Sequence, residues 1–388
     1  MSKRDKRIRD RPRWYERARF EDHPYRVWRV DRWPGYLAKY WRKRPSAPGE
    51  VVGHFDAVRR SAGAGQVPPA DFTLAAVGDI LWMRRGWEDF ISPPVAEALR
   101  ADLVFGNLET PVCPTRPVRE RVPDLLRLNA PPALLDTLAH HRFDVLSAVN
   151  NHSLDQGPEG WRRTLAEVRR RAMAPIEPFT CEMVERRGLR AAFLAFTTLM
   201  NPQRGAAPRP SAVVRPDGQG QEALLEAVRE ARAAGAALVV VSAHWGYEYE
   251  YFPDRWQLSL AREIAAAGAD VILGHHPHVV QPAEFIPAAA PSAGLAAVCY
   301  SLGNFVSAMF TLSCRVGVVA RLGFSLSGDR PRMTSLEFVP TLVRIREGLR
   351  AQVVRLERSA AAGVGPAQIR RARALLEGRM PLRLVPPR

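Results

Sequence analysis

Cysteine, lysine and long apolar runs are all scarce in this chain of 388 residues. The four cysteines (Cys113, Cys181, Cys299 and Cys314) lie far apart and form no C-x-x-C pair. This spacing argues against a zinc ribbon and against a dense disulfide framework. No apolar run approaches the roughly 20 residues that span a bilayer, and the N-terminus lacks the apolar core of a secretory signal. We therefore expect a cytoplasmic protein from a reducing compartment.

Lysine is absent after residue 43, and positive charge is concentrated near the N-terminus. Residues 1–70 contain 18 lysines and arginines against 8 acidic residues, in a chain whose net charge is +16. The basic residues alternate with aromatic ones, namely Trp14, Tyr15, Tyr25, Trp28, Trp33, Tyr36, Tyr40 and Trp41. Such a segment can bind a polyanionic substrate, an anionic membrane surface or nucleic acid. Alternatively, its tryptophans pack on the rest of the protein and its charges face water.

A Gly/Ala/Pro-rich linker at 61–70 ends this extension, and an α/β pattern begins at residue 71. Short apolar strands then alternate with amphipathic helices, which is typical of an α/β sheet. We expect strands at 72–77, 103–105, 144–147, 190–196, 237–243 and 269–273, and helices at 131–141, 157–171, 221–234 and 254–267.

After residue 278 the pattern changes to successive strands at 296–301, 317–325 and 333–339, which suggests a second, antiparallel sheet. A helical tail is expected from about residue 343. The predicted organisation is an extension at 1–70, a catalytic domain at 71–340 and a C-terminal tail at 341–388.

Polar side chains stand at the ends of these strands. The strand at 269–273 runs into Gly274-His275-His276-Pro277-His278, and imidazole is the commonest metal ligand in proteins. The other polar residues at strand ends are Asp79, Asn107, Glu109, Asn150, Asn151, His152, His244 and Asn304. Side chains from several strand ends converge when the loops share one edge of a sheet. Carboxylate, carboxamide and imidazole without thiolate suit Mn²⁺, Fe²⁺/³⁺ or Zn²⁺.

Each of these residues also has a purely structural interpretation. Asp79 can cap a turn, Asn107 can hold a tight turn, and His244 can be a hydrogen-bonded structural histidine. The collective placement favours a site, because five of the nine histidines fall at strand ends.

Six motifs carry a resemblance to a known family. They are Val77-Gly78-Asp79-Ile80-Leu81, Gly106-Asn107-Leu108-Glu109, Asn150-Asn151-His152 with Asp155 and Gly157, His244-Trp245-Gly246 with Glu248, Gly274 to Gln281, and Tyr300-Ser301-Leu302-Gly303-Asn304-Phe305. In this order they resemble the CapA family of bacterial capsule and poly-γ-glutamate synthesis proteins. That family is similar to the calcineurin-like metallophosphoesterases. The resemblance implies a four-layer α/β/β/α sandwich with a dinuclear metal site at the strand ends.

The resemblance also implies roles for single residues. The implied ligands of two divalent ions (Mn, Fe or Zn) are Asp79, Glu109, Asn151, His244, His276 and His278. The resemblance implies that His152 is a general acid or an oxyanion stabiliser. Glu248, as a general base, and Asp155 are further candidate catalytic residues. The residues expected to support the ligands are Asn107, His275 and Asn304. One departure stands out, because the Asp-x-His that is usual in the phosphoesterases reads Asp79-Ile80-Leu81 here.

Two features after His244 have open interpretations. Glu248 can instead form a surface salt bridge with Arg255. Trp245, Tyr247, Tyr249 and Tyr251 can line a wall for a polymer, or simply alternate along a strand.

Three functions fit these observations. The first is a metal-dependent hydrolase that acts on a γ-glutamyl amide or an anionic polymer or metabolite intermediate through a metal-activated water. The second is a phosphoesterase acting on a nucleotide or phosphorylated sugar, and the third is a non-catalytic accessory protein in capsule synthesis. We expect an acidic substrate and contact of the extension with the inner membrane surface, and we do not expect a nucleic-acid partner.

Overall fold

The computed structural model describes residues 47–61, 69–115, 127–178, 180–201, 214, 218, 220–288, 294–328 and 330–386. The aromatic, basic stretch at 1–46 and most of the linker at 61–70 lie outside these residues, and so does the question of what the tryptophans contact.

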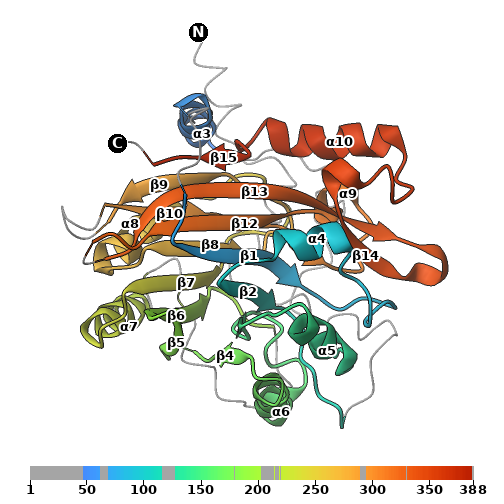
Figure 1. The fold of residues 1–388 in the computed structure, drawn as a ribbon, viewed down its shortest axis with the longest axis horizontal. Coiled ribbons are helices and arrows are strands. Elements are labelled where there is room, and N and C mark those ends of the chain that lie inside the picture. Colours follow the sequence, from blue (N-terminus) through green and yellow to red (C-terminus); the bar gives the residue numbers. More distant parts are fainter. Residues whose placement is uncertain are drawn as a thin grey trace, which may run out of the picture.

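Two stacked β-sheets form the centre of the described structure (Figure 1). The first contains, in spatial order, β14 (Ala351–Arg355), β13 (Arg332–Ile345), β12 (Val316–Ser325), β1 (Phe72–Ile80), β2 (Leu103–Leu108), β3 (Val145–Ser147) and β4 (Ala174–Ile176), with β11 (Asn304–Val306) paired to β1 and β15 (Arg383–Leu384) paired to β13. The second contains β5 (Glu182–Arg186), β6 (Leu189–Thr197), β7 (Leu238–His244), β8 (Val271–His275), β10 (Leu295–Cys299) and β9 (Ala283–Pro287).

Helices cover the outer face of each sheet. The first sheet packs against α4 (Pro93–Ala98), α5 (Ala133–His140) and α6 (Gly157–Arg169), and the second against α3 (Gly49–Ser61), α7 (Gln221–Ala233) and α8 (Arg255–Ala267). The C-terminal region adds α9 (Leu312–Arg315), α10 (Pro366–Glu377) and the short 3₁₀ helices η5 (Glu347–Leu349) and η6 (Leu356–Arg358). The predicted four-layer α/β/β/α sandwich is confirmed.

Successive side chains along each strand point to opposite faces, so each sheet packs against two hydrophobic cores. In β1, Leu74 and Ala76 point into the core between the sheets, whereas Ala75 and Val77 point toward the helices. The rings of Phe105 and Phe193 stack across the inter-sheet core with centroids 6.1 Å apart. This core fixes the distance between the two sheets.

Parallel pairing brings the carboxyl ends of the strands to a common edge. The pairs β1–β2, β2–β3, β6–β7 and β7–β8 are all parallel. Their register places Asp79 opposite both Asn107 and Asn304, and His244 opposite His275. Residues far apart in sequence therefore become neighbours at one edge.

The expectation of a separate antiparallel sheet is wrong. Strands β12 and β13 are antiparallel, but they extend the first sheet because β12 pairs with β1 along Phe72–Val77. Strand β10 joins the second sheet as a parallel neighbour of β8. Periodicity identifies strands but says nothing about their partners.

The C-terminal tail is only partly helical. Strand β13 continues to Ile345, and β14 and β15 add to the same sheet, so that α10 is the one α-helix after residue 340 in the described structure. Arginines at outward-facing positions interrupt the apolar pattern of this segment, so its strands were not predicted. Helix α3, inside the expected extension, is not evident from the sequence pattern. It buries Val51 and Phe55, four residues apart, against the second sheet.

Candidate metal centre

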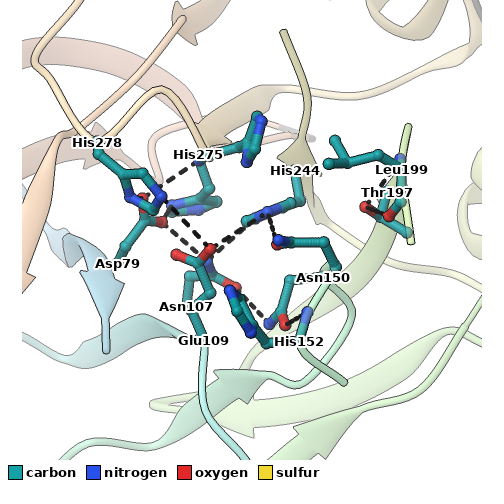
Figure 2. Close-up of polar contacts among 12 residues, drawn as sticks. Asp79, Asn107, Glu109, Asn150, His152, Thr197, Leu199, His244, His275 and His278 are labelled. Atoms are coloured by element: carbon teal, nitrogen blue, oxygen red, sulfur yellow. Dashed lines mark hydrogen bonds and ion pairs between the residues drawn. The ribbon is translucent and has the colours of Figure 1, made fainter. Parts of the chain in front are cut away.

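Polar side chains from the ends of strands in both sheets lie together at their common edge (Figure 2). Asp79, Asn107, Glu109, Asn304, His244 and His275 have no exposed surface, and Asn150, Asn151, His152, Glu248, His276 and His278 are also buried. Such a concentration of buried polar groups has to be stabilised by mutual contacts or by a bound ion.

Glu109 lies at the centre of this cluster. Its Oε1 is 3.6 Å from His244 Nε2 and 3.9 Å from His278 Nε2 (Figure 2). Within the described part of the chain, neither of its carboxylate oxygens has a hydrogen-bond partner. Burial, followed by the charge of Asp79, raises the pKa of Glu109 well above its usual value. A buried carboxylate of this kind is strongly destabilising unless a cation accompanies it.

Asp79 is held by contacts from both sheets. Its Oδ1 accepts a hydrogen bond from Asn107 Nδ2 (2.8 Å), and its Oδ2 accepts one from the backbone N–H of His276 (3.2 Å). His278 Nδ1 lies 3.2 Å from Oδ2 and His275 Nδ1 lies 3.4 Å from Oδ1. Although burial acts to raise it, the contacts with His275 and His278 hold the pKa of Asp79 well below its usual range. Asp79 is therefore ionised at neutral pH.

His244 and Asn151 face each other beside Glu109. His244 Nε2 is 2.8 Å from Asn151 Oδ1. Burial and then the nearby His276 keep the pKa of His244 well below its usual value, so the ring is neutral. Neutral imidazole is the form that binds a metal ion.

The backbone of the histidine segment is strained. His276 and His278 have φ angles of 94° and 57°, which residues other than glycine rarely adopt. Strain of this type, about 1–3 kcal/mol per residue, is concentrated at functional sites. These backbone conformations direct both imidazoles toward the cluster. His278 Nδ1 is also hydrogen-bonded to Asn304 Oδ1 (3.0 Å).

The donor atoms fall into three groups that suit metal ions. The groups are Glu109 with His244 and His276, Asp79 with Glu109 and His278, and Glu248 with His276 and His278, and in each the ligand atoms lie within 4.8 Å of one another. Metal–ligand bonds of about 2.0–2.6 Å place the ligands of one ion at such separations. The first two groups share Glu109, so the residues present fit a pair of adjacent ions.

His152 stands at the edge of the cluster in a hydrogen-bonded pair with Asp155. His152 Nδ1 is 2.6 Å from Asp155 Oδ2, which also accepts the backbone N–H of Leu128 (2.7 Å). Asn201 Nδ2 lies 3.3 Å from Asp155 Oδ1 and 3.1 Å from His152 Nδ1. The orientation of the His152 ring is therefore fixed from its Nδ1 side.

Glu248 lies in the cluster and not on the surface. The alternative of a surface salt bridge with Arg255 is not supported, because Glu248 is buried and Arg255 pairs with Glu50. Burial raises the pKa of Glu248 to about 7. The aromatic wall is not supported, since Trp245 is fully buried and stacks on Tyr300, and Tyr247 is buried as well.

No role was predicted from the sequence for two residues of the site, Asn150 and Asn201. Asn150 donates from Nδ2 to the carbonyl of Leu108 (2.9 Å) and accepts the N–H of His152 at Oδ1 (3.1 Å). Asn201 connects Asn151 to the His152–Asp155 pair. Asn201 comes four residues after the end of β6, so the rule of polar residues at strand ends would find it with a wider window.

Fold and site together define a four-layer α/β protein with a buried histidine–carboxylate cluster of metal-binding type. Residues 73–309 match the family described as "Bacterial capsule synthesis protein PGA_cap". The chain belongs to this family, as its motifs led us to expect.

Two curated relatives are similar over the same region. The PGA biosynthesis protein CapA of Bacillus subtilis (strain 168) is 31% identical over 257 residues, which cover 61% of this chain and 64% of the relative. The capsule biosynthesis protein CapA of Bacillus anthracis is 29% identical over 256 residues, covering 60% and 59%. The chain thus matches less than two thirds of the length of these relatives.

Similarity to solved structures is weaker. The sulfate thiohydrolase SoxB of Thermus thermophilus has a TM-score of 0.39 at 12% identity, covering 81% of this chain and 61% of that one. A second Thermus thermophilus protein, TT1561, has a TM-score of 0.34 at 10% identity, covering 64% and 93%. Neither match bears on the activity of this chain. Separately, no helix among the described residues is long and apolar enough to cross a membrane.

Proposed function

We propose that this protein is a metal-dependent hydrolase that cleaves a γ-glutamyl amide bond in an anionic capsule-polymer intermediate. One observation carries the proposal. The fully buried Glu109 has imidazole nitrogens of His244 and His278 on either side and, in the described structure, no hydrogen bond to either oxygen. A structural role would not require a carboxylate there, whereas a bridging metal ligand would.

Two adjoining sets of side chains would hold the ions. Asp79, Glu109 and His278 form one set, and Glu109, Asn151, His244 and His276 form the other. Divalent ions bound there would polarise the scissile bond and lower the pKa of the attacking water toward 7. Asn107 and Asn304 hold the Asp79 and His278 side chains in place.

His152 is suited to protonate the leaving group. Asp155 accepts a hydrogen bond from Nδ1 and stabilises the imidazolium, so that Nε2 can donate a proton to the departing amine. General acid catalysis of this kind contributes about 10²–10⁴-fold to a rate. The same pair would serve whether the leaving group is an amine or an alcohol.

The charge of the chain and the names of its relatives support an acidic substrate. A net charge of +16 attracts polyanions over long distances. The B. subtilis relative bears the name "PGA biosynthesis protein". Within this proposal, the basic residues 1–70 rest on the inner surface of an anionic membrane and the site faces the cytoplasm.

The test measures metal and bond cleavage on the same preparation. Protein purified without chelator is analysed by mass spectrometry for metal content, in parallel with His276→Ala. Glutamate release from a γ-linked oligomer is then compared with turnover of an aryl phosphodiester. We expect metal in the parent, less in the variant, and glutamate release. A metal ratio near zero in the parent contradicts the proposed catalysis, and turnover of the phosphodiester alone would establish the phosphoesterase alternative.

A further inference from the structure

A small cavity lies beside the segment that follows β1. Its volume is about 270 Å³, and it is lined by Arg84, Arg85, Gly348 and Leu349. The two arginines belong to the segment after β1, whereas Gly348 and Leu349 belong to η5, in the connection between β13 and β14. Pockets for drug-sized ligands begin at about 300 Å³, so this cavity suits one small chemical unit.

Main-chain contacts hold the two walls of the cavity together. The carbonyl of Arg85 accepts the N–H of Ala351 (3.0 Å), the first residue of β14, and Arg85 also forms a parallel bridge with Arg350. Gly86 has a φ of 98°, and a Cβ there would lie 2.7 Å from the carbonyl oxygen of Ala351. Glycine therefore permits this close approach, which fixes the arginine segment against the start of β14.

The charges of the two arginines are not neutralised by neighbouring carboxylates. Both side chains are exposed, and within the part of the chain that the structure describes neither forms an ion pair. The acidic residues that follow them, Glu88 and Asp89, pair instead with Arg350, at 3.8 and 2.9 Å. Guanidinium groups bind carboxylates through two parallel hydrogen bonds, so Arg84 and Arg85 are suited to an anionic ligand.

The remaining lining of the cavity is apolar. Leu349 is 43% exposed, which is unusual for a large apolar side chain in this structure, and Gly348 adds no side chain at all. Glu347 precedes them but is not among the lining residues. Two guanidinium groups beside an apolar wall match a carboxylate that is carried on a short aliphatic chain.

The cavity is close enough to the metal centre for one polymer to reach both. Arg84 follows Asp79 by five residues, so their Cα atoms are at most about 18 Å apart. The segment between them leaves the sheet at the edge where the metal cluster lies. It runs beside the segment after β11, because the carbonyl of Trp82 accepts the N–H of Ala308 (3.2 Å). A chain of several repeat units can span this distance, whereas a single small metabolite cannot.

We propose that the cavity is a subsite that binds one glutamyl unit of a γ-linked polymer, away from the scissile bond. The inference rests on the proposed function and assigns its substrate as a polymer. A γ-linked chain leaves one carboxylate free on every residue, and two methylene groups lie next to it. Arg84 and Arg85 bind the free carboxylate, and Leu349 contacts the methylene groups. The subsite therefore holds the polymer in place while another of its amide bonds lies at the metal centre.

The experiment measures binding and cleavage of one probe, a fluorescein-labelled γ-linked decamer of glutamate, by the full-length protein at physiological salt. Fluorescence anisotropy gives the dissociation constant, and glutamate release gives KM. The test variant combines Arg84→Gln with Arg85→Gln. The matched control combines Arg162→Gln with Arg163→Gln, which removes the same charge from exposed positions of α6, a helix that packs on β4 at the opposite end of the first sheet from β14. Thermal unfolding and metal analysis show whether each variant is folded and loaded as the parent is.

We expect the test variant to bind the decamer at least about tenfold more weakly and to show a similar increase in KM, whereas the control binds as the parent does. Equal affinity of the test variant and the parent, or an equal loss in the control, would overturn the subsite and leave the proposed function intact. A parent that binds the decamer through the arginine pair but releases no glutamate would support the subsite and contradict the proposed hydrolase.

Discussion

Glu109 should lower the stability of the metal-free protein although it is needed for metal binding. Burial, then the charge of Asp79, raises the pKa of this carboxyl, so in metal-free protein the folded state binds the proton more tightly than the unfolded state does. The stability that Glu109 contributes is present at low pH and is lost as the pH rises through the raised pKa. We expect Glu109→Gln to increase the free energy of unfolding at neutral pH by about 1–3 kcal/mol in chelator, and to abolish metal binding.

Urea unfolding in EDTA at pH 5 and pH 8 checks this prediction. The difference between parent and variant should be larger at pH 8, because only the parent has the Glu109 carboxyl, whose ionisation burial disfavours. A difference that is the same at both pH values would show that Glu109 titrates normally.

The Asp155 carboxylate should matter for turnover and not for metal content. Asp155→Asn weakens the hold on His152 Nδ1 and removes the charge that stabilises the imidazolium. We predict a decrease in kcat of about 100-fold or more with little change in KM. Steady-state kinetics measures the decrease, and metal analysis of the same preparation should show parental content because Asp155 is in none of the ligand groups found among described residues.

Gly78 should not tolerate a side chain. A Cβ at this position would lie 1.8 Å from the carbonyl oxygen of Gly303, where β1 passes close to the turn before β11. Gly78→Ala should therefore decrease the free energy of unfolding by about 3 kcal/mol or more. The matched control is Gly53→Ala in α3, with no atom within 4 Å, which should be neutral or stabilising by up to about 1 kcal/mol. Equal effects of the two substitutions in urea would contradict this prediction.

At the scale of secondary structure, the sequence predicted most of the strands that carry the site. Asp79, His244 and His276 could be predicted as site residues because each follows a short apolar run, and the ends of parallel strands lie at one edge of a sheet. Asn201 could not be predicted in this way, because it lies several residues after the end of its strand. The pairing of β12 with β1 could not be predicted either, because it depends on contacts between residues some 240 positions apart. Helix α3 (Gly49–Ser61) was not predicted, because its residues were assigned to the basic extension.

Helix α3 connects the N-terminal region to the loops of the site. His54 Nε2 is 2.7 Å from Glu284 Oε2, whose Oε1 accepts the hydroxyl of Tyr300 (2.8 Å). The carbonyl of Tyr300 in turn accepts Trp245 Nε1–H (3.0 Å), and Trp245 follows His244 in the chain. The chain of contacts therefore reaches from α3 to the residue next to a candidate ligand.

Loss of the α3 contacts should decrease stability by a measurable amount. We predict that Phe55→Ala decreases the free energy of unfolding by about 3–5 kcal/mol, because a buried phenylalanine leaves a cavity. His54→Ala should cost about 1–3 kcal/mol, since Glu284 keeps only one of its two hydrogen bonds. Arg60→Ala, an exposed position on the same helix, should stay within about 0.5 kcal/mol of the parent. If Phe55→Ala behaves like Arg60→Ala in urea, α3 is not docked in solution.

The candidate metal ligands come from both sheets of the molecule. Asp79 lies near the end of β1 and Glu109 directly after β2, both in the first sheet. His244 ends β7, and His276 and His278 come just after β8, both in the second sheet. A bound ion would therefore join the two halves of the sandwich. At 100 times its dissociation constant, a ligand that binds only the folded state adds about 2.7 kcal/mol of stability.

Metal removal should accordingly destabilise the entire fold. We expect EDTA to lower the thermal midpoint of the parent, excess Mn²⁺ to restore it, and His276→Ala to respond less to both. Differential scanning fluorimetry provides the measurement. A parent whose midpoint is unchanged by EDTA, after metal content has been shown to fall, would mean that the ion does not hold the sheets together.

The part of the chain that matches the family model is shorter than the part that forms the two sheets. A chain cut to residues 73–309 would contain every residue described for the site, yet it would lack β12, which pairs with β1 along Phe72–Val77. The strand that presents Asp79 would then become an open sheet edge, and open apolar edges recruit strands from other molecules. Domain limits drawn from sequence similarity would thus favour an aggregating fragment, whereas a fragment that keeps α3 and the strands beside β1 extends from Gly49 through β13.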